Sequence, residues 1–340
     1  MSYKLGSFNI CNFNDPRRSK KQFETDINLI ARIIRNEGFD IVALQEVLAE
    51  EVLRDYLIPT LNRGNIKWDY RWEKPKKSDP YEAEGYAFIW NTRTMELSYS
   101  NWFEYANGTS ALVKRKVEPH IYDKYRIDTS RGEFQLARNP YYGRFKPVRG
   151  FCELRLINTH IRSGKDSEDH YWDEDEIKEV AQRVNEIKIL NSVIYHTLSN
   201  RRYGNNMPAY TILLGDYNLN LKSSGCGYPL YPSDQMGVIV IDDKGTKQYI
   251  KTVQDEPTSL KKPKKNDRNR HNAYGYANNF DHFSYDEKRF DGVGKKVKRI
   301  DTVSKYCNND FQKHLDVVSD HVPIAMMINL RNEEILWEDN

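Results

Sequence analysis

An apolar run ends abruptly in an acid and two amides at Leu213-Leu214-Gly215-Asp216-Tyr217-Asn218-Leu219-Asn220, the stretch LLGDYNLN. Gly, Asp and Asn commonly form turns, so the stretch is consistent with the plain end of a strand. The alternative is a buried strand that delivers Asp216 and Asn218 to the edge of a sheet. Side chains two residues apart on an extended chain point to the same side. A carboxylate and an amide would then converge on one oxygen-rich ligand.

Other apolar runs in the chain end in the same kinds of residue. Residues 39–47 (FDIVALQEV) form an almost continuous apolar run, typical of a strand buried on both faces, and Glu46 lies at its end. Residues 151–161 (FCELRLINTHI) are similar and carry His160. Taken singly, each such residue is more often a solvated or packing residue than a functional one. The residues that follow or close an apolar run in this way are Asn9, Glu46, His160, Asp216, Asn218, Asp281, Asp320 and His321.

Three segments show the spacing of an amphipathic helix. Apolar residues recur at helical intervals in residues 19–38, and a second helix is predicted over residues 50–62. The strongest helical pattern covers residues 173–199, where four acids at the start suit the positive end of the helix dipole. Two strand-like runs, residues 85–91 (GYAFIWN) and 95–100 (MELSYS), predict a hairpin. Helices and strands therefore alternate along the chain.

The totals exclude several classes of protein. No apolar run approaches the roughly 20 residues of a membrane span, and no signal-peptide segment is evident. The four cysteines lie far apart without a CxxC pair, so neither a disulfide framework nor a zinc site is predicted. With no repeat or linker, we expect one cytoplasmic domain over residues 1–340 (core about 3–330), a monomer by default. The net charge is only +3, so any polyanion-binding surface has to come from local charge segregation.

The polar strand ends are consistent with one chemistry when they are taken together. Sheet strands bring such ends to one edge of a core. Carboxylates and amides suit a hard cation such as Mg²⁺, which binds one or two carboxylates and substrate phosphate oxygens. Two histidines beside acids can exchange protons near neutral pH. The set therefore indicates metal-assisted cleavage of a phosphate ester.

The motifs SFNICNF, DIVALQEV, EGYAFIWN, NTHI, LLGDYNLN, NNFDHF and SDHVPI occur in this order. In them the chain resembles the endonuclease/exonuclease/phosphatase superfamily, most closely its deoxyribonuclease I-like branch. The resemblance implies an α+β fold, a four-layered α/β/β/α sandwich of two mostly antiparallel sheets flanked by helices. It also implies a metal-dependent phosphodiesterase, first of all an endonuclease that hydrolyses DNA by in-line attack of water. Mg²⁺ is the expected ion, with Mn²⁺ or Ca²⁺ as alternatives.

The resemblance assigns roles to individual residues. Asn9 and Glu46 match the residues that hold the divalent ion, with Glu46 as the principal ligand. Asp320 matches an acid near the metal. Asp216 matches the acid that positions or activates the attacking water, and Asn218 matches the amide that contacts the scissile phosphate.

Two histidines and their partners complete the implied active site. His321 matches the histidine at the phosphate, and Asp281 matches the carboxylate that orients it. His160 matches a second histidine, and Glu84 lies where its carboxylate partner is expected. Arg138, in FQLARNP, resembles an arginine that reaches a substrate phosphate.

Two departures from the family pattern concern the choice of substrate. Leu48 follows QEV, where the pancreatic-type enzyme has an arginine that reads the minor groove. The loop between Leu219 and Phe280 is long and carries six basic residues and one acid in residues 261–270 (KKPKKNDRNR). A solvated loop is the plain interpretation, but its place between two site strands predicts a clamp on nucleic-acid phosphates. The candidate contacts are Lys261, Lys262, Lys264 and Lys265.

Other substrates and an inactive chain remain as alternatives. The same fold would also serve RNA or a phospholipid or inositol phosphate ester, and NTHI is compatible with several of these. That motif argues against an abasic-site repair enzyme, where tyrosine is usual, and the lack of a membrane-binding amphipathic helix argues against lipid. A binding module without activity would be expected to have lost a charged site residue, yet all of them are present.

Overall fold

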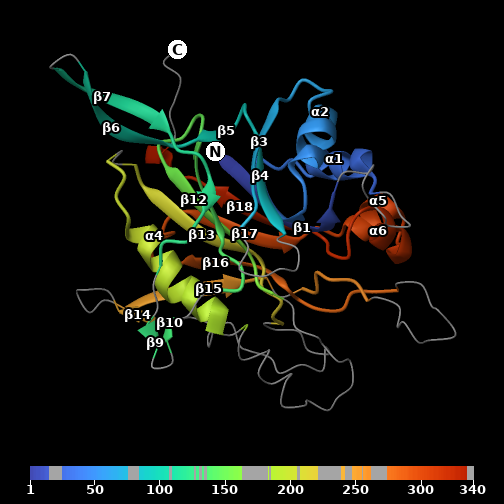
Figure 1. Ribbon diagram of the computed structural model, residues 1–340. Helices are drawn as coiled ribbons and strands as arrows, with labels where there is room; N and C mark the ends of the chain where they lie inside the picture. The colour runs from blue at the N-terminus through green and yellow to red at the C-terminus, as the bar shows by residue number, and fades with distance from the viewer. Residues whose placement is uncertain are drawn as a thin grey trace.

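The computed structural model describes the following segments of the chain, which together form one fold. They are residues 1–14, 25–75, 84–106, 109–125, 128–129, 132–133, 136–162, 183, 185–204, 207–220, 239–241, 247–254, 256–261 and 274–334. Two large sheets pack face to face, and helices lie on their outer faces (Figure 1). The four-layered sandwich expected from the sequence is confirmed.

Within the described residues, the first sheet has six strands in the order β17-β18-β1-β2-β4-β3. Their bounds are β1 Ser2–Phe13, β2 Ile41–Val47, β3 Trp68–Glu73, β4 Gly85–Asn91, β17 Gly294–Arg299 and β18 Ile324–Asn329. Only β1 and β2 are parallel, with Asn9 opposite Gln45. Their carboxyl ends therefore meet at one edge of the sheet.

The second sheet has eight strands within the described residues, in the order β14-β15-β16-β13-β12-β11-β5, with β8 also pairing β11. Their bounds are β5 Met95–Leu97, β8 His120–Ile121, β11 Tyr141–Pro147, β12 Glu153–His160, β13 Ala209–Asp216, β14 Ile239–Ile241, β15 Lys247–Val253 and β16 Asp281–Asp286. Here β12 and β13 are the parallel pair. Two separate ribbons pair β6 (Tyr99–Ala106) with β7 (Thr109–Lys116) and β9 (Asp128–Thr129) with β10 (Gly132–Glu133).

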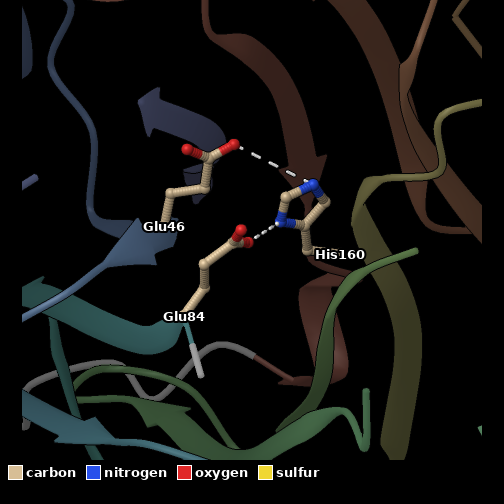
Figure 2. A group of neighbouring side chains, drawn as sticks. All are labelled: Glu46, Glu84 and His160. Atoms are coloured by element: carbon tan, nitrogen blue, oxygen red, sulfur yellow. Dashed lines mark ion pairs between the residues drawn. The ribbon is translucent and has the colours of Figure 1, made fainter. Parts of the chain in front are cut away.

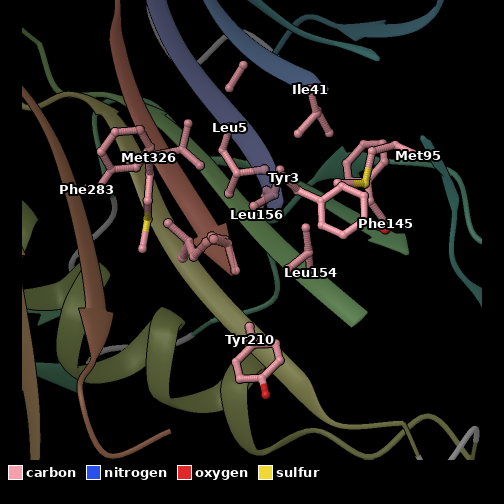
Figure 3. Packing of buried hydrophobic residues seen from close by; sticks show 14 of the residues in the cluster. Tyr3, Leu5, Ile41, Met95, Phe145, Leu154, Leu156, Tyr210, Phe283 and Met326 are labelled. Carbon is pink, nitrogen blue, oxygen red and sulfur yellow. The ribbon is translucent and has the colours of Figure 1, made fainter. Parts of the chain in front are cut away.

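The main core lies between the two sheets (Figure 3). Leu5 and Met326 of the first sheet and Leu156 of the second are buried in it. The Phe88 ring lies 5.0 Å from the Tyr141 ring, centroid to centroid, in a stacked arrangement across the interface. Such aromatic pairs add to the stabilisation that comes from burial alone.

Helices cover the outer face of each sheet (Figure 1). The first sheet is covered by α1 Ile27–Asn36, the π-helical η1 Val52–Leu57, α2 Ile58–Leu61, α5 Thr302–Cys307 and α6 Phe311–Val317. The second is covered by η2 Leu190–Tyr195 and α4 His196–Asn200, and a short η3 spans Asn332–Glu334. Among the described helices we find no segment with the length and apolar character of a bilayer span.

The helix predictions hold where the structure describes the chain. The first helix begins only at Ile27, where Asp26 accepts a hydrogen bond from the backbone of Leu29, and Gly38 follows its end with φ of +64°. Residues 15–24 lie outside the described residues. The second helix is confirmed, with a π-helical middle. The third is helical from residue 185 to 200, and residues 163–182 and 184 lie outside the described residues.

The predicted hairpin of residues 85–91 and 95–100 is wrong. Strand β4 pairs with β2 on one edge and β3 on the other, whereas β5 pairs with β11 in the second sheet. Because both edges of β4 are occupied, the chain that follows it has to cross to the other sheet.

A buried ion-pair network links β11 and β12 at the end of the second sheet. Glu153 is fully buried, and its carboxylate accepts hydrogen bonds from Arg144 Nη2 at 2.5 Å and Arg155 Nε at 2.7 Å. The Tyr203 ring lies against the guanidinium of Arg144, 3.4 Å from Cζ to the ring centroid. Burial alone would raise the pKa of Glu153, but the hydrogen bond and charge of Arg144 hold it below its ordinary value. Glu153 is therefore a charged group on which two buried cations depend.

We predict that Glu153→Gln lowers the free energy of unfolding by about 3–5 kcal/mol, because the substitution leaves buried guanidinium charge without its partner. Urea denaturation near neutral pH measures the change. The matched control is Glu96→Gln, which removes an acid that pairs with Lys116 and Lys146 at the surface and should cost less than about 1 kcal/mol. Equal losses in the two variants would contradict a structural role for the network.

Candidate active site

The candidate site lies where parallel strands of both sheets end. Strand β1 runs past Asn9, the polar residue at the end of its apolar run, and continues to Phe13 with a break in its register after Asn9. Cys11, Asn12 and Glu46 have positive φ values of 46°, 52° and 61°. A left-handed backbone conformation costs free energy at a residue other than glycine, and it persists only where the surrounding structure holds it. Here the backbone N–H of Asn12 donates to Glu46 Oε2 at 2.8 Å, which holds the carboxylate at the strand end.

Asp216 occupies the centre of the site. The register of β12, β13 and β16 places it directly between His160 and Asp281. Its Oδ2 lies 3.6 Å from His160 Nε2 and 3.7 Å from His321 Nε2. Burial raises the pKa of Asp216, and the charge of His321 opposes that rise. Asp216 is thus a desolvated carboxylate between two histidines.

His321 is held by a buried acid. Its Nδ1 lies 2.7 Å from Oδ2 of Asp281, which is fully buried. Burial alone would lower the pKa of His321, but the charges of Asp281 and Asp216 raise it to about 10. With its Nδ1–H donated to Asp281, the imidazolium presents its other N–H toward Asp216. The imidazolium supplies a positive charge and a proton at neutral pH.

His160 has an equivalent partner on its other side. Its Nδ1 lies 2.7 Å from Glu84 Oε2, and its Nε2 lies 3.9 Å from Glu46 Oε1 (Figure 2). Arg138 contacts the same pair, with Nη2 2.8 Å from Glu84 Oε1 and Nη1 2.9 Å from His160 Nδ1. Burial would lower the pKa of His160, but the hydrogen bond to Glu84 raises it above its ordinary value. The sequence placed Arg138 at a substrate phosphate, and in this structure it binds Glu84.

The side chain of Asn9 joins the two sheets at the site. Its Nδ2 donates to Glu46 Oε1 at 2.9 Å and to Asp216 Oδ2 at 3.0 Å. Two carboxylates thus converge on one point, which a partly positive amide group fills. Such a point fits a hard cation, because the two carboxylates offer oxygen donors there.

Among the described residues, two groups of ligand atoms within 4.8 Å of one another could hold a metal ion. One is Glu46, Glu84 and His160, and the other is Asp216, Asp281 and His321. The predicted ligand Asp320 is buried beside His321. Ser319, which precedes Asp320, donates its hydroxyl to the carbonyl of Asn9 at 2.7 Å. The metal-ligand roles of Asn9, Glu46 and Asp320 stay predictions.

Of the other predicted residues, Asn218 lies in the site and Lys261 lies at the surface. Asn218 donates its backbone N–H to Asp216 at 2.8 Å and its side-chain amide to the Ile161 carbonyl at 2.7 Å, so it holds the ends of β12 and β13 together. Lys261 is exposed. Three of the predicted basic contacts lie outside the described residues, namely Lys262, Lys264 and Lys265.

Three hydroxyl groups support the site and were not predicted. The Ser319 hydroxyl accepts from the His321 backbone at 3.0 Å, and Thr258 accepts from the backbone of Asp281 at 3.2 Å. The Tyr86 hydroxyl accepts from the backbone of His160 at 3.1 Å. Ser319 and Tyr86 lie inside the motifs SDHVPI and EGYAFIWN, so proximity to the motif residues was the available signal.

We predict that Asp281→Asn lowers the pKa of His321 from about 10, as measured by NMR titration of the imidazole in EDTA. Because that pKa lies above the roughly 6.5 of an unfolded chain, the pair stabilises the folded protein below about pH 6.5. The stabilisation is lost as the pH rises toward 10, and Asp281→Asn should flatten this part of the stability curve. The internal control is His314, whose pKa is lowered to about 4 by burial and should not move. An unchanged His321 titration would refute the pairing.

Comparison with known proteins identifies the family and the fold. Residues 6–242 match the Endonuclease/Exonuclease/phosphatase family. The fold is similar to D. rerio TDP2 complexed with single strand DNA product, with a TM-score of 0.50 and 13% identity over 97% of this chain and 99% of that one. It is also similar to ANGEL2, a 2',3'-cyclic phosphatase (TM-score 0.51, 13% identity, 96% and 95% covered).

The human Nocturnin catalytic domain with bound sulfate anion is a further similar structure, with a TM-score of 0.51 and 11% identity over 97% of this chain and 95% of that one. At these identities the likeness concerns the fold. No curated protein matches the sequence. The family match covers most of the chain, and the chain therefore belongs to the Endonuclease/Exonuclease/phosphatase family.

Proposed function

We propose that the chain is a divalent-metal-dependent phosphodiesterase that hydrolyses nucleic acid. The preferred substrate is DNA, which the protein cleaves as an endonuclease. The observation that carries the proposal is the approach of two histidine–carboxylate pairs to one buried acid, with His160 Nε2 at 3.6 Å and His321 Nε2 at 3.7 Å from Asp216. Phosphoryl transfer depends mainly on positioning and electrostatics, and this arrangement supplies both.

The proposed reaction is an in-line attack of water on phosphorus. Asp216 orients the water and accepts its proton, and its raised pKa makes it a better base than an exposed carboxylate. The new P–O bond forms as the bond to the leaving oxygen breaks, and the His160 imidazolium donates a proton to that oxygen. His321 keeps its charge at neutral pH and stabilises the negative charge on the phosphate. His160 is the second proton carrier, oriented by Glu84.

A divalent ion held by Asn9 and Glu46, with Asp320 nearby, would neutralise negative charge that develops on the phosphate oxygens. The protein's own contribution to that site is the held carboxylate of Glu46, which the backbone of Asn12 and the amide of Asn9 orient. Mg²⁺ is proposed because oxygen donors predominate.

Three features support a nucleic-acid substrate. The family includes endonucleases and exonucleases by name, and the similar D. rerio TDP2 was solved with single strand DNA product. Arg138 lies at the site with a fifth of its side chain exposed, so it can turn toward a substrate phosphate. Lys261 is exposed at the start of the basic run, whose other proposed contacts, Lys262, Lys264 and Lys265, lie outside the described residues. Asn218 is proposed to contact the scissile phosphate.

The cellular setting is a separate proposal that rests on the cysteines. Cys152 and Cys307 are free, buried thiols, which a reducing compartment preserves. A cytoplasmic, monomeric and single-domain protein stays the prediction made from the sequence.

The substrate is tested by digesting plasmid DNA, single-stranded DNA, RNA and a phospholipid phosphodiester side by side with Mg²⁺. Cleavage of DNA in preference to the lipid supports the proposal. Selective cleavage of the lipid, or of no phosphodiester at all, would overturn it.

We predict that Glu46→Gln keeps the fold and reduces DNA cleavage by at least about 100-fold, since a metal supplies several kcal/mol of transition-state stabilisation. Excess EDTA should abolish cleavage by the native protein. The matched control is Glu50→Gln, which changes a nearby carboxylate that accepts the Tyr70 hydroxyl at 3.0 Å and should leave cleavage unchanged. Undiminished cleavage in EDTA would exclude the metal mechanism.

A further inference from the structure

A short two-stranded stem joins the proposed active site to the surface. We use the term stem for residues 256–261 and 274–280. Leu260 pairs with Tyr276, and the backbone of Lys261 donates to the Gly275 carbonyl at 2.9 Å. At its inner end Ser259 pairs directly with His321. The stem is therefore in backbone contact with a proposed active-site residue.

The inner part of the stem is held firmly in place. The Tyr276 hydroxyl donates to Asp301 at 2.6 Å, and its ring packs edge-on against Phe311 with 5.2 Å between centroids. The Arg299 guanidinium lies 4.0 Å from the same ring. The backbone N–H of Leu260, which is buried, donates to the carbonyl of Asp320 at 2.8 Å. These contacts fix the direction in which the stem leaves the site.

The outer end of the stem carries an exposed aromatic ring beside a cation. Tyr274 is 66% exposed, the highest value among the exposed large hydrophobic side chains of the described residues. Lys261 Nζ lies 5.4 Å from the centroid of its ring. A single exposed apolar residue is ordinary. Tyr274 differs because it lies beside a cation, on a stem that contacts the proposed active site. This combination suits the binding of a ligand.

We infer that Tyr274 and Lys261 form a stacking platform for an unpaired base of single-stranded nucleic acid, next to the scissile phosphate. The inference rests on the proposed function and deepens it. Aromatic rings stack on any base, and a neighbouring cation binds the phosphate backbone. This combination selects nucleic acid over phosphate esters that lack a base.

The geometry limits which nucleotide is bound. Two residues of extended chain, about 7 Å, separate Ser259, which pairs with His321, from Lys261. The platform therefore serves a nucleotide that flanks the reacting phosphate, so Tyr274 is a binding residue and takes no part in the chemistry. A base in a duplex is already stacked and has to be extruded at a cost of a few kcal/mol, so the platform favours single strands.

The test measures kcat/KM with Mg²⁺ for a labelled single-stranded oligonucleotide and for the small diester bis(p-nitrophenyl) phosphate. In Tyr274→Ala the ratio of the two values should fall about 5- to 100-fold, mainly through a higher KM for the oligonucleotide. Tyr274→Phe keeps the ring and should keep the ratio. Leu112→Ala, a distant exposed residue on β7, should match the native protein for both substrates.

A second measurement isolates the cation. Lys261→Gln should reduce the slope of log affinity against log salt for single strands by about 0.7, the contribution of one phosphate contact. The Tyr274→Ala loss should be smaller on a duplex of the same sequence.

The outcomes separate the two proposals. If the native protein cleaves the oligonucleotide and Tyr274→Ala keeps the native ratio, the platform is wrong and the proposed function stands. If the native protein cleaves the small diester and no nucleic acid, the proposed substrate class is wrong and the platform fails with it.

Discussion

The burial of Asp216 is the constraint on which the rest of the site depends. A desolvated carboxylate needs positive partners close to it, and those partners are themselves buried and need acids of their own. The result is a row in which acids and histidines alternate: Glu84, His160, Asp216, His321 and Asp281, in which successive groups lie between 2.7 and 3.7 Å apart. The alternation allows five ionisable groups to share a space that would exclude each of them alone. It also places proton donors on both sides of one base.

The spacing of the two sheets is the second requirement, because the first sheet supplies Glu46 and the second supplies Asp216. Behind the site the sheets are joined by polar contacts as well as by the apolar core. The buried amide of Gln45 donates to Asn158 Oδ1 at 2.7 Å, and Asn158 donates in turn to the carbonyl of Leu44 at 3.0 Å. Apolar packing tolerates sliding more readily than hydrogen bonds of defined direction do. These contacts therefore hold the distance that Asn9 bridges when it binds both carboxylates.

The strand ends of the site could be predicted from the sequence because each follows a long apolar run, and the order of the motifs indicated the fold. The pairing partner of β5 could not be predicted, since periodicity does not say which sheet a strand joins. The extension of β1 past Asn9 was missed because it requires positive φ at Cys11, a residue with no preference for that conformation. The engagement of Arg138 by Glu84 was also missed, since it depends on a contact between residues 54 positions apart.

The proposed function depends on a divalent ion held by Glu46 and Asn9, and the Asn9 amide in this structure donates to both Glu46 and Asp216. The most direct measurement is a crystal structure at saturating Mn²⁺, with anomalous differences collected to locate the ion. We predict a strong peak at the Glu46 carboxylate, with the Asn9 amide turned so that it no longer donates from Nδ2 to both acids. A structure in which that amide still bridges Glu46 and Asp216, and in which no Mn²⁺ is bound at Glu46, would contradict the account.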